Sequence, residues 1–197
     1  MSEKELEERV MISKDQFLEI EKYLQENFHN VKTIFQKNRY LDDKNMTVKK
    51  VHNVLRIRSF RSCKMRELTY KVKGQDGDIE YNQMLSHYWF YQITRDSRFP
   101  EGCVKEQLLK DGVDLSSVKL LMELYTRRME VKIDDYLFVL DTNLYNGICD
   151  YNIEIESDVS KKHAKEVILK YCEKFGLTYD ENYISKSRRA FNSLNKN

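Results

Sequence analysis

The chain has 197 residues, with 34 Lys and Arg against 32 Asp and Glu, so its formal net charge is 34 − 32 = +2 at pH 7. This balance does not favour a general nucleic-acid binder, which carries a large basic excess. With 41% hydrophobic and 34% charged residues, one proline and six glycines, the sequence predicts one folded, charge-rich domain over residues 1–197, without a flexible linker.

The first half of the chain predicts one helix among several strands. Residues 4–12 alternate as a strand does, and Ser13 followed by Gln16 is a capping-box start for a helix that runs to about Phe28. Further strands, the last two separated by a turn at 74–77, are predicted at 31–42, 54–60, 66–73 and 78–85.

The second half begins with two helical segments, at 86–97 and 104–111. Three long strands are then predicted at 119–133, 136–143 and 148–157. Ser160 caps a helix that ends at Gly176, and a short element at 183–191 closes the chain. The predicted fold is therefore α+β and mainly antiparallel β.

Several other classes of protein lack their sequence signals here. No apolar run approaches the ~20 residues of a membrane span, and the N-terminus has no apolar signal core, so we expect a cytoplasmic protein with no membrane partner. The four cysteines are scattered and form no Cys-x-x-Cys pair, which argues against structural zinc and against a disulfide framework. The chain also has no glycine-rich phosphate loop, no His-Glu-x-x-His and no Gly-x-Ser-x-Gly.

Charged residues gather on one face of several predicted strands, because residues two apart in a strand point to the same side. The sets that share a face are Glu5, Glu7 and Arg9; Arg56 and Arg58; Lys71 and Lys73; Arg128, Glu130 and Lys132; and Glu154 and Glu156. A flat sheet with one face in water would explain this pattern. A barrel with a polar lumen and helices on its outside would explain it as well, and its crowded carboxylates would then need metal ions and basic partners.

The order of short motifs along residues 5–189 distinguishes these alternatives. In chain order the motifs are Glu5-Leu6-Glu7-Glu8-Arg9, Tyr40-Leu41-Asp42, Leu55-Arg56-Ile57-Arg58, Leu68-Thr69-Tyr70-Lys71, Glu80, Arg128, Leu140-Asp141, Glu154-Ile155-Glu156 and Lys186-Ser187-Arg188-Arg189. This order resembles the CYTH proteins, the bacterial branch of the triphosphate tunnel metalloenzymes. The most similar subgroup is the small, single-domain CYTH proteins of low-GC Gram-positive bacteria.

The resemblance implies a closed eight-stranded antiparallel barrel, with helices packed on its outside and a lumen that binds a triphosphate together with Mg²⁺ or Mn²⁺. Such ions prefer hard oxygen ligands, and phosphate oxygens suit the fork of arginine and the point charge of lysine. The implied metal ligands are Glu5, Glu7, Glu154, Glu156, Asp141 and Glu80. The implied phosphate-binding residues are Arg56, Arg58, Lys71, Arg128 and Lys186. The implied catalytic residues are Glu5, Glu7 and Arg9.

The function that this resemblance implies is a divalent-metal-dependent phosphohydrolase acting on a small-molecule triphosphate. Inorganic triphosphate, thiamine triphosphate and nucleoside triphosphates all remain open as substrates. One alternative is a class IV-type adenylyl cyclase, which would make cyclic AMP and pyrophosphate from ATP in the same tunnel. Another is a sensor that binds polyphosphate or a nucleotide without turnover.

The chain departs from the family motif at Arg9, where the family has a lysine. An arginine cannot lose a proton to act as a base, so only a charge role carries over to this position. Arg189 lies in the neighbourhood of the predicted site, but we expect it at the rim or on the surface.

Overall fold

A computed structural model of the chain describes residues 2–74 and 77–194. It contains a nine-stranded sheet in the order β1-β6-β5-β4-β3-β7-β8-β9-β2. The predicted α+β, mainly antiparallel fold is confirmed, with nine strands instead of eight. The ninth arises because the first predicted strand is interrupted at Leu6, which separates β1 (Ser2–Glu5) from β2 (Glu7–Ile12).

The chain forms two compact units, each assembled from two stretches of sequence. Unit 1 comprises Met1–Lys4 and Gln36–Leu124, and unit 2 comprises Glu5–Phe35 and Tyr125–Asn197. The expectation of one domain over residues 1–197 stays a prediction.

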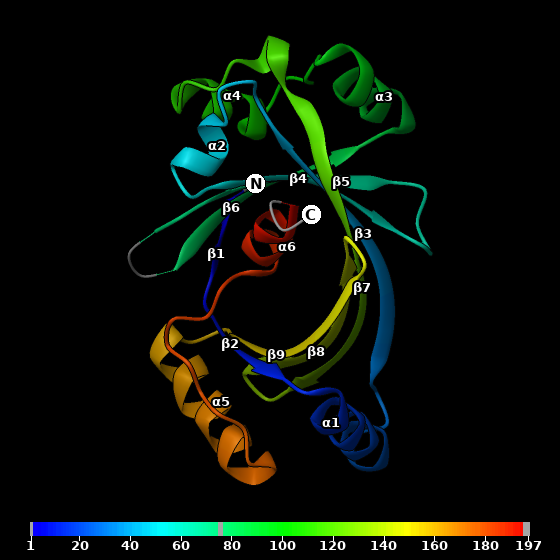
Figure 1. Ribbon diagram of the computed structural model, residues 1–197, viewed down its shortest axis with the longest axis vertical. Coiled ribbons are helices and arrows are strands. Elements are labelled where there is room, and N and C mark those ends of the chain that lie inside the picture. Colours follow the sequence, from blue (N-terminus) through cyan, green and yellow to red (C-terminus); the bar gives the residue numbers. More distant parts are fainter. Residues whose placement is uncertain (1, 75–76, 195–197) are drawn as a thin grey trace. The chain divides into compact units, whose positions relative to one another are not determined.

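Unit 2 carries the strand order β7-β8-β9-β2, with every neighbouring pair antiparallel. Besides β2, it contains α1 (Lys14–Asn27), part of β7 (Lys119–Ile133), β8 (Tyr136–Tyr145), β9 (Ile148–Ser157), α5 (Lys161–Phe175) and α6 (Lys186–Leu194). Helices α1 and α5 lie on one side of β8 and β9, and α6 lies on the other side (Figure 1).

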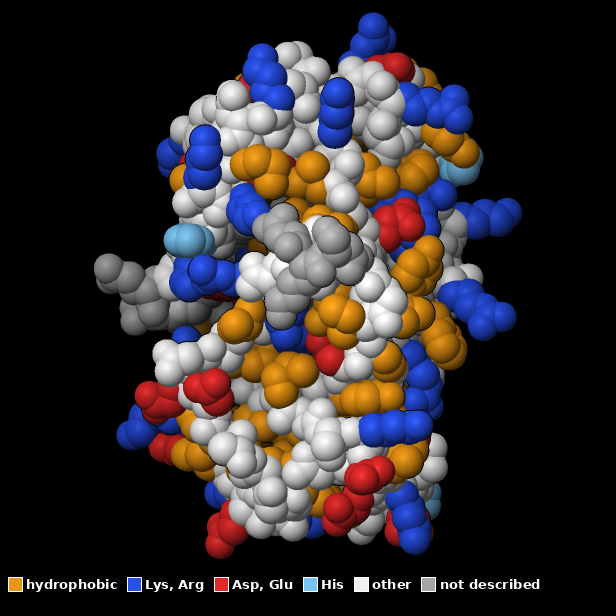
Figure 2. Space-filling view, viewed as in Figure 1, with side chains coloured by type: hydrophobic (Ala, Val, Ile, Leu, Met, Phe, Trp, Pro, Cys, Tyr) orange, Lys and Arg blue, Asp and Glu red, His pale blue; other side chains and the backbone are white. Residues whose placement is uncertain are grey.

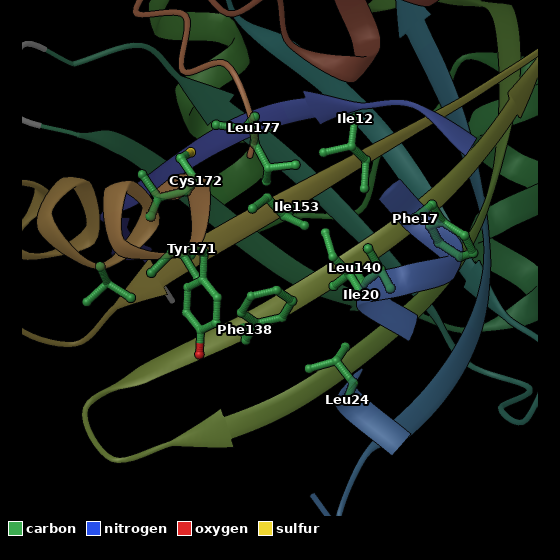
Figure 3. Packing of buried hydrophobic residues seen from close by; sticks show 14 of the residues in the cluster. Ile12, Phe17, Ile20, Leu24, Phe138, Leu140, Ile153, Tyr171, Cys172 and Leu177 are labelled. Atoms are coloured by element: carbon green, nitrogen blue, oxygen red, sulfur yellow. The ribbon is translucent and has the colours of Figure 1, made fainter. Parts of the chain in front are cut away.

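The core of unit 2 occupies the side of the sheet that α1 and α5 cover. Phe138 and Leu140 of β8 are fully buried, and Figure 3 shows them close to Ile20 of α1 and Tyr171 of α5. Because side chains alternate along a strand, Asp141 points to the opposite face from Leu140. The same alternation therefore directs the polar residues of β8 and β9 toward the face on which α6 lies.

The sequence signals at the ends of α1 and α5 are confirmed. The Ser13 Oγ accepts a hydrogen bond from the backbone N–H of Gln16 at 3.2 Å, and the Gln16 Oε1 accepts one from the backbone N–H of Ser13 at 2.9 Å. This reciprocal pair is the predicted capping box. At the end of α5, Gly176 has φ 59°, a left-handed conformation that glycine adopts without steric cost.

Unit 1 carries the strand order β6-β5-β4-β3. Its elements are most of β3 (Lys32–Asp42), α2 (Thr47–Lys50), β4 (Val54–Phe60), β5 (Arg66–Val72), β6 (Asp78–Leu85), α3 (His87–Asp96), α4 (Cys103–Lys110) and the 3₁₀ turn Leu115–Ser117. A second apolar core joins these strands to the helices, which lie on one side of β4 and β5 (Figure 1). The turn predicted at 74–77 includes residues 75 and 76, which lie outside the described part of the chain.

The short helix α2 has no counterpart among the predicted elements. Two buried carboxylates hold its first turn: Asp42 accepts hydrogen bonds from the backbone N–H groups of Val48 at 3.0 Å and Lys49 at 2.9 Å. Asp43 accepts one from the N–H of Thr47 at 2.9 Å. Asp42 of the Tyr-x-Asp motif therefore satisfies helix N–H groups that would otherwise lack partners.

Within the described ranges, no helix is both long enough and apolar enough to span a membrane. On the face drawn in Figure 2, Lys and Arg side chains stand beside Asp and Glu side chains over much of the surface. The face drawn there therefore reflects the balanced composition of the sequence.

Candidate active site

Three partly buried glutamates of unit 2 form a group that can bind a cation. The antiparallel register places Glu7 of β2 opposite Glu156 of β9, and Glu5 precedes them on β1. One carboxylate oxygen from each of Glu5, Glu7 and Glu156 lies within 4.8 Å of the others. Oxygen ligands at such spacing suit a hard divalent cation.

The charge state of Glu7 reflects this crowding. Burial disfavours its ionised form, and the neighbouring charges of Glu154 and Glu156 act in the same direction, while Arg9 opposes them. The net result raises the pKa of Glu7 to about 7. At neutral pH a substantial fraction of Glu7 is therefore protonated. A further positive charge nearby would favour its ionised form.

Arg128 of β7 connects the carboxylates of β8 and β9. Its Nε and Nη2 donate to the two carboxylate oxygens of Asp141 at 3.0 and 2.9 Å, as a two-pronged fork. The same guanidinium donates to Glu154 Oε2 at 2.7 Å and to Glu156 Oε1 at 3.3 Å. The register that places Arg128 opposite Asp141 produces this geometry.

Glu154 is 1% exposed and is surrounded by cations. Its Oε1 lies 2.9 Å from Arg9 Nε and 3.0 Å from Lys186 Nζ, and its Oε2 accepts from Arg128. Burial alone would raise the pKa of Glu154, but Lys186, Arg9 and Arg128 hold it well below its usual range. Glu154 therefore stays ionised and holds Arg9, Arg128 and Lys186 around its carboxylate.

Lys186, the first residue of α6, reaches the sheet from the side opposite the core. Its ammonium contacts Asp141 as well as Glu154, and its side chain is 15% exposed. Burial lowers the pKa of Lys186, against the opposing influence of Asp141 and Glu154. The residue was predicted from a motif near the end of the chain, and the structure places it beside the predicted carboxylates.

The acidic group, defined as Glu5, Glu7, Asp141, Glu154 and Glu156, contains five carboxyl groups. Arg9, Arg128 and Lys186 are among the cations that contact it within the described part of the chain. The close spacing of the donor oxygens and their partial burial fit a magnesium or manganese site.

Unit 1 holds a second cluster, the basic group, defined as Arg56, Arg58 and Lys71. Arg56 Nη2 lies 3.3 Å from Glu80 Oε1, and Lys71 Nζ lies 3.9 Å from the same atom. Burial would raise the pKa of Glu80, but the surrounding cations hold it below its usual value. Glu80, predicted as a metal ligand, therefore lies among cations in unit 1.

Arg58 is oriented by a buried amide on the neighbouring strand. Its Nε donates to Asn38 Oδ1 at 2.9 Å, across the pairing of Arg58 with Asn38 in the β3–β4 register. Arg56 and Arg58 are two residues apart on β4 and share a face, as predicted. The sheet thus presents two guanidinium groups side by side.

Sequence reasoning missed a set of polar residues that support the acidic group. Asn143 Nδ2 donates to Asn152 Oδ1 at 2.8 Å, and Asn152 Nδ2 donates to Glu154 Oε1 at 3.3 Å. Asp150 lies further along the same strand face. The signal was present in the sequence, because positions 150, 152, 154 and 156 have the same parity on β9.

A comparison with protein families matches the CYTH domain to residues 3–186. The chain therefore belongs to the CYTH domain family, as the order of its motifs predicted.

Individual relatives agree with this assignment. YjbK of Bacillus subtilis (strain 168), a candidate triphosphatase, is 34% identical over 155 residues, which cover 78% of this chain and 77% of YjbK. A candidate adenylate cyclase from Bacillus halodurans has a similar structure, with a TM-score of 0.86 and 27% identity over 96% of this chain and 98% of its own. A Hippeastrum protein described as a candidate adenylyl cyclase with a dominant triphosphatase activity shares the fold, with a TM-score of 0.79 and 20% identity over 96% of each chain.

Proposed function

We propose that this protein is a divalent-metal-dependent phosphohydrolase that acts on a small-molecule triphosphate. The observation that carries the proposal is the convergence of Glu5, Glu7 and Glu156, whose carboxylate oxygens lie within 4.8 Å of one another, beside Arg128, which contacts Glu156. The triphosphatase description of YjbK, whose sequence is 34% identical, supports the same chemistry.

In this proposal Glu5, Glu7 and Glu156 hold Mg²⁺ or Mn²⁺. A bound divalent ion would supply a Lewis acid for phosphoryl oxygens and would lower the pKa of a coordinated water. Arg128 and Lys186 would bind phosphate oxygens, and Glu154 would keep both cations in place. Arg9 contributes charge only, because its guanidinium stays protonated.

The basic group of unit 1 would also bind phosphate oxygens. Arginine pairs on one strand face offer several parallel N–H donors, and lysine adds a compact charge. Such cations neutralise the charge of phosphate oxygens that they contact. Arg56, Arg58 and Lys71 are therefore proposed as phosphate-binding residues.

A product assay tests the proposal and separates it from the alternatives. Inorganic triphosphate, thiamine triphosphate and ATP are each incubated with the protein and Mg²⁺ or Mn²⁺, and phosphate, pyrophosphate and cyclic AMP are measured. Metal-dependent release of phosphate is the expected result. Cyclic AMP with pyrophosphate would identify a cyclase, and binding without any product would identify a sensor.

A pair of variants locates the activity. Glu156→Gln removes one proposed metal ligand and should reduce metal-dependent turnover by orders of magnitude. Glu8→Gln changes the same side-chain type on β2, where Glu8 accepts a hydrogen bond from the Tyr179 hydroxyl outside the acidic group, and should keep the turnover of the parent. Equal turnover in both variants would show that the acidic group is not the active site.

A further inference from the structure

The helix that carries Lys186 is held to unit 2 by a second set of polar contacts, away from the acidic group. Arg189 lies one turn after Lys186 on α6, and its guanidinium forms a fork with Asp150 of β9. Nε donates to Asp150 Oδ2 at 2.8 Å, and Nη2 donates to Oδ1 at 2.9 Å. Arg189 is 12% exposed and Asp150 14%, so Arg189 does not lie on the open surface; its expected alternative position, at the rim of the site, stays a prediction.

Asp150 is itself fixed by neighbours on the β8–β9 hairpin. The Tyr145 hydroxyl donates to Asp150 Oδ2 at 2.5 Å, and Asn143 Nδ2 donates to Asp150 Oδ1 at 3.1 Å. Burial opposes the charged form of Asp150, but the hydrogen bond and charge of Arg189 hold its pKa below the usual value. The carboxylate is therefore a rigid, ionised anchor for the arginine.

A further contact joins the tip of the same hairpin to α6. Asn146, which has a left-handed backbone with φ 47°, donates from Nδ2 to Ser193 Oγ at 2.8 Å and to the Ala190 carbonyl at 3.2 Å. The hairpin therefore contacts α6 at two separated points. It also carries Asp141 and Glu154, the two carboxylates that Lys186 contacts.

These contacts stabilise a helix that is too short to be stable alone. A helix of nine residues is marginal in water without tertiary contacts, and a lysine side chain loses considerable rotamer entropy when it is held in one place. Lys186 stands at the first position of this helix, where fraying would move its ammonium most. A fork one turn further along fixes the helix backbone without occupying Lys186 itself.

We propose that Asp150 and Arg189 are positioning residues, which hold α6 so that the Lys186 ammonium stays on Asp141 and Glu154. The consequence for substrate rests on the proposed function, in which Lys186 binds a phosphate group of the triphosphate. Asp150 and Arg189 would then influence substrate binding only through Lys186.

The first experiment measures the position of Lys186 without substrate or metal. Amine labelling of the folded protein, followed by mass spectrometry, compares Lys186 with the exposed Lys162 as an internal standard. Asp150→Asn should raise the labelling rate of Lys186 by about tenfold or more, because the charge-assisted fork is lost. Arg189→Lys, which keeps the charge and removes the fork, should raise it in the same direction and serves if Asp150→Asn does not fold.

A matched control removes a different helix–sheet ion pair of the same unit. Glu21 of α1 accepts from Arg127 Nη2 of β7 at 2.6 Å. Glu21→Gln should leave the labelling of Lys186 unchanged, even where it lowers the melting temperature. Unchanged labelling of Lys186 in the folded Asp150 and Arg189 variants would overturn the proposal.

The second experiment asks whether the effect passes through Lys186. Asp150→Asn should raise the KM for the triphosphate substrate by about tenfold, with a smaller effect on kcat. In a Lys186→Gln background the same change should have no further effect on KM; an undiminished effect there would overturn the proposal. Faster labelling with an unchanged KM would support the positioning role and would count against Lys186 as a phosphate ligand in the proposed function.

Discussion

At the scale of single residues, Glu7 and Glu154 have opposite charge balances although both lie in the acidic group. Glu154 is surrounded by Arg9, Arg128 and Lys186, and its pKa lies well below the usual range. Burial and neighbouring carboxylates raise the pKa of Glu7 to about 7. The surroundings therefore stabilise the ionised form of Glu154 and the protonated form of Glu7.

The raised pKa of Glu7 predicts how the stability of the metal-free protein depends on pH. Between a pKa near 4.5 in the unfolded chain and about 7 in the folded protein, the folded state binds more protons, so its stability falls as pH rises through this window. The loss amounts to about 3 kcal/mol for the whole shift. Chemical denaturation at pH 5, 6, 7 and 8 in the presence of a chelator measures it.

The control for this pH dependence is a pair of variants on β2. Glu7→Gln should flatten the slope between pH 5 and 8, because the titrating group is gone. Glu8→Gln, outside the acidic group, should keep the slope of the parent. A slope that survives in Glu7→Gln would place the titration on another residue.

Glu7→Gln and Glu154→Gln should change the free energy of unfolding in opposite directions. At pH 8 without metal, Glu7→Gln should raise the free energy of unfolding, since it removes a crowded negative charge. Glu154→Gln should lower it by several kcal/mol, on the order of 3–5, because Arg9, Arg128 and Lys186, each at most 16% exposed, lose their common partner. Denaturant titrations of both variants test this, and a shared sign would contradict the charge balance described above.

Arg9 allows a test of proton transfer at the position where the family motif has lysine. Arg9 contacts Glu7 and Glu154, so it already has a charge role. Arg9→Lys should keep turnover within about tenfold of the parent, with the same number of limbs in the pH–rate profile. A large rate gain with a new alkaline limb would show a vacant proton-transfer role, and would favour the sensor over the hydrolase.

At the scale of elements, β4 presents Arg56 and Arg58 on one face, and this arrangement predicts a ligand response. Triphosphate should raise the melting temperature by mass action, and by more than orthophosphate does. Arg56→Gln and Arg58→Gln should each reduce that shift. Arg61→Gln, just beyond the end of β4 and exposed, should respond to triphosphate as the parent does. Equal shifts in all three variants would remove Arg56 and Arg58 from the phosphate-binding set.

Elements whose signals are local were predicted well. The strands at 54–60 and 78–85 have the predicted bounds, and the capping box of α1 forms as expected. Helix α2 was missed because its stabilising contacts are partly distant in sequence. Asp43, which holds its first turn, also accepts a hydrogen bond from the backbone N–H of Asp114 at 3.0 Å. A local sequence pattern cannot indicate a hydrogen-bond partner that lies so far along the chain.

At the scale of the whole molecule, strand parity predicted which residues face the site but not which charges would pair. Parity placed Arg128, Glu154 and Glu156 on shared faces, and the structure brings these three together. It could not show that Lys186 and Arg9 would converge on Glu154, because that depends on strand register and on the path of the chain to α6. The pairing of Arg189 with Asp150 could not be predicted for the same reason.

The whole protein should remain folded when metal is removed. Arg9, Arg128 and Lys186 already contact the acidic group, and both apolar cores are formed by side chains alone. A chelator should therefore leave the circular dichroism spectrum unchanged, and Mg²⁺ should then raise the melting temperature in a concentration-dependent way. Unfolding on chelation would show instead that the ion is part of the folding core, as in small zinc domains.

In the proposed function, the proton that Glu7 binds near neutral pH would make metal binding an acid-releasing reaction. A cation that binds Glu5, Glu7 and Glu156 must displace that proton, so Mg²⁺ and H⁺ compete for one carboxylate. Calorimetric titrations in buffers of different ionisation enthalpy should show close to one proton released at pH 6 and close to none at pH 8.5. Below neutrality, each unit of acidification should weaken the apparent affinity for magnesium by about tenfold. Loading of the site would thereby report on the acidity of its surroundings, through a single glutamate on β2.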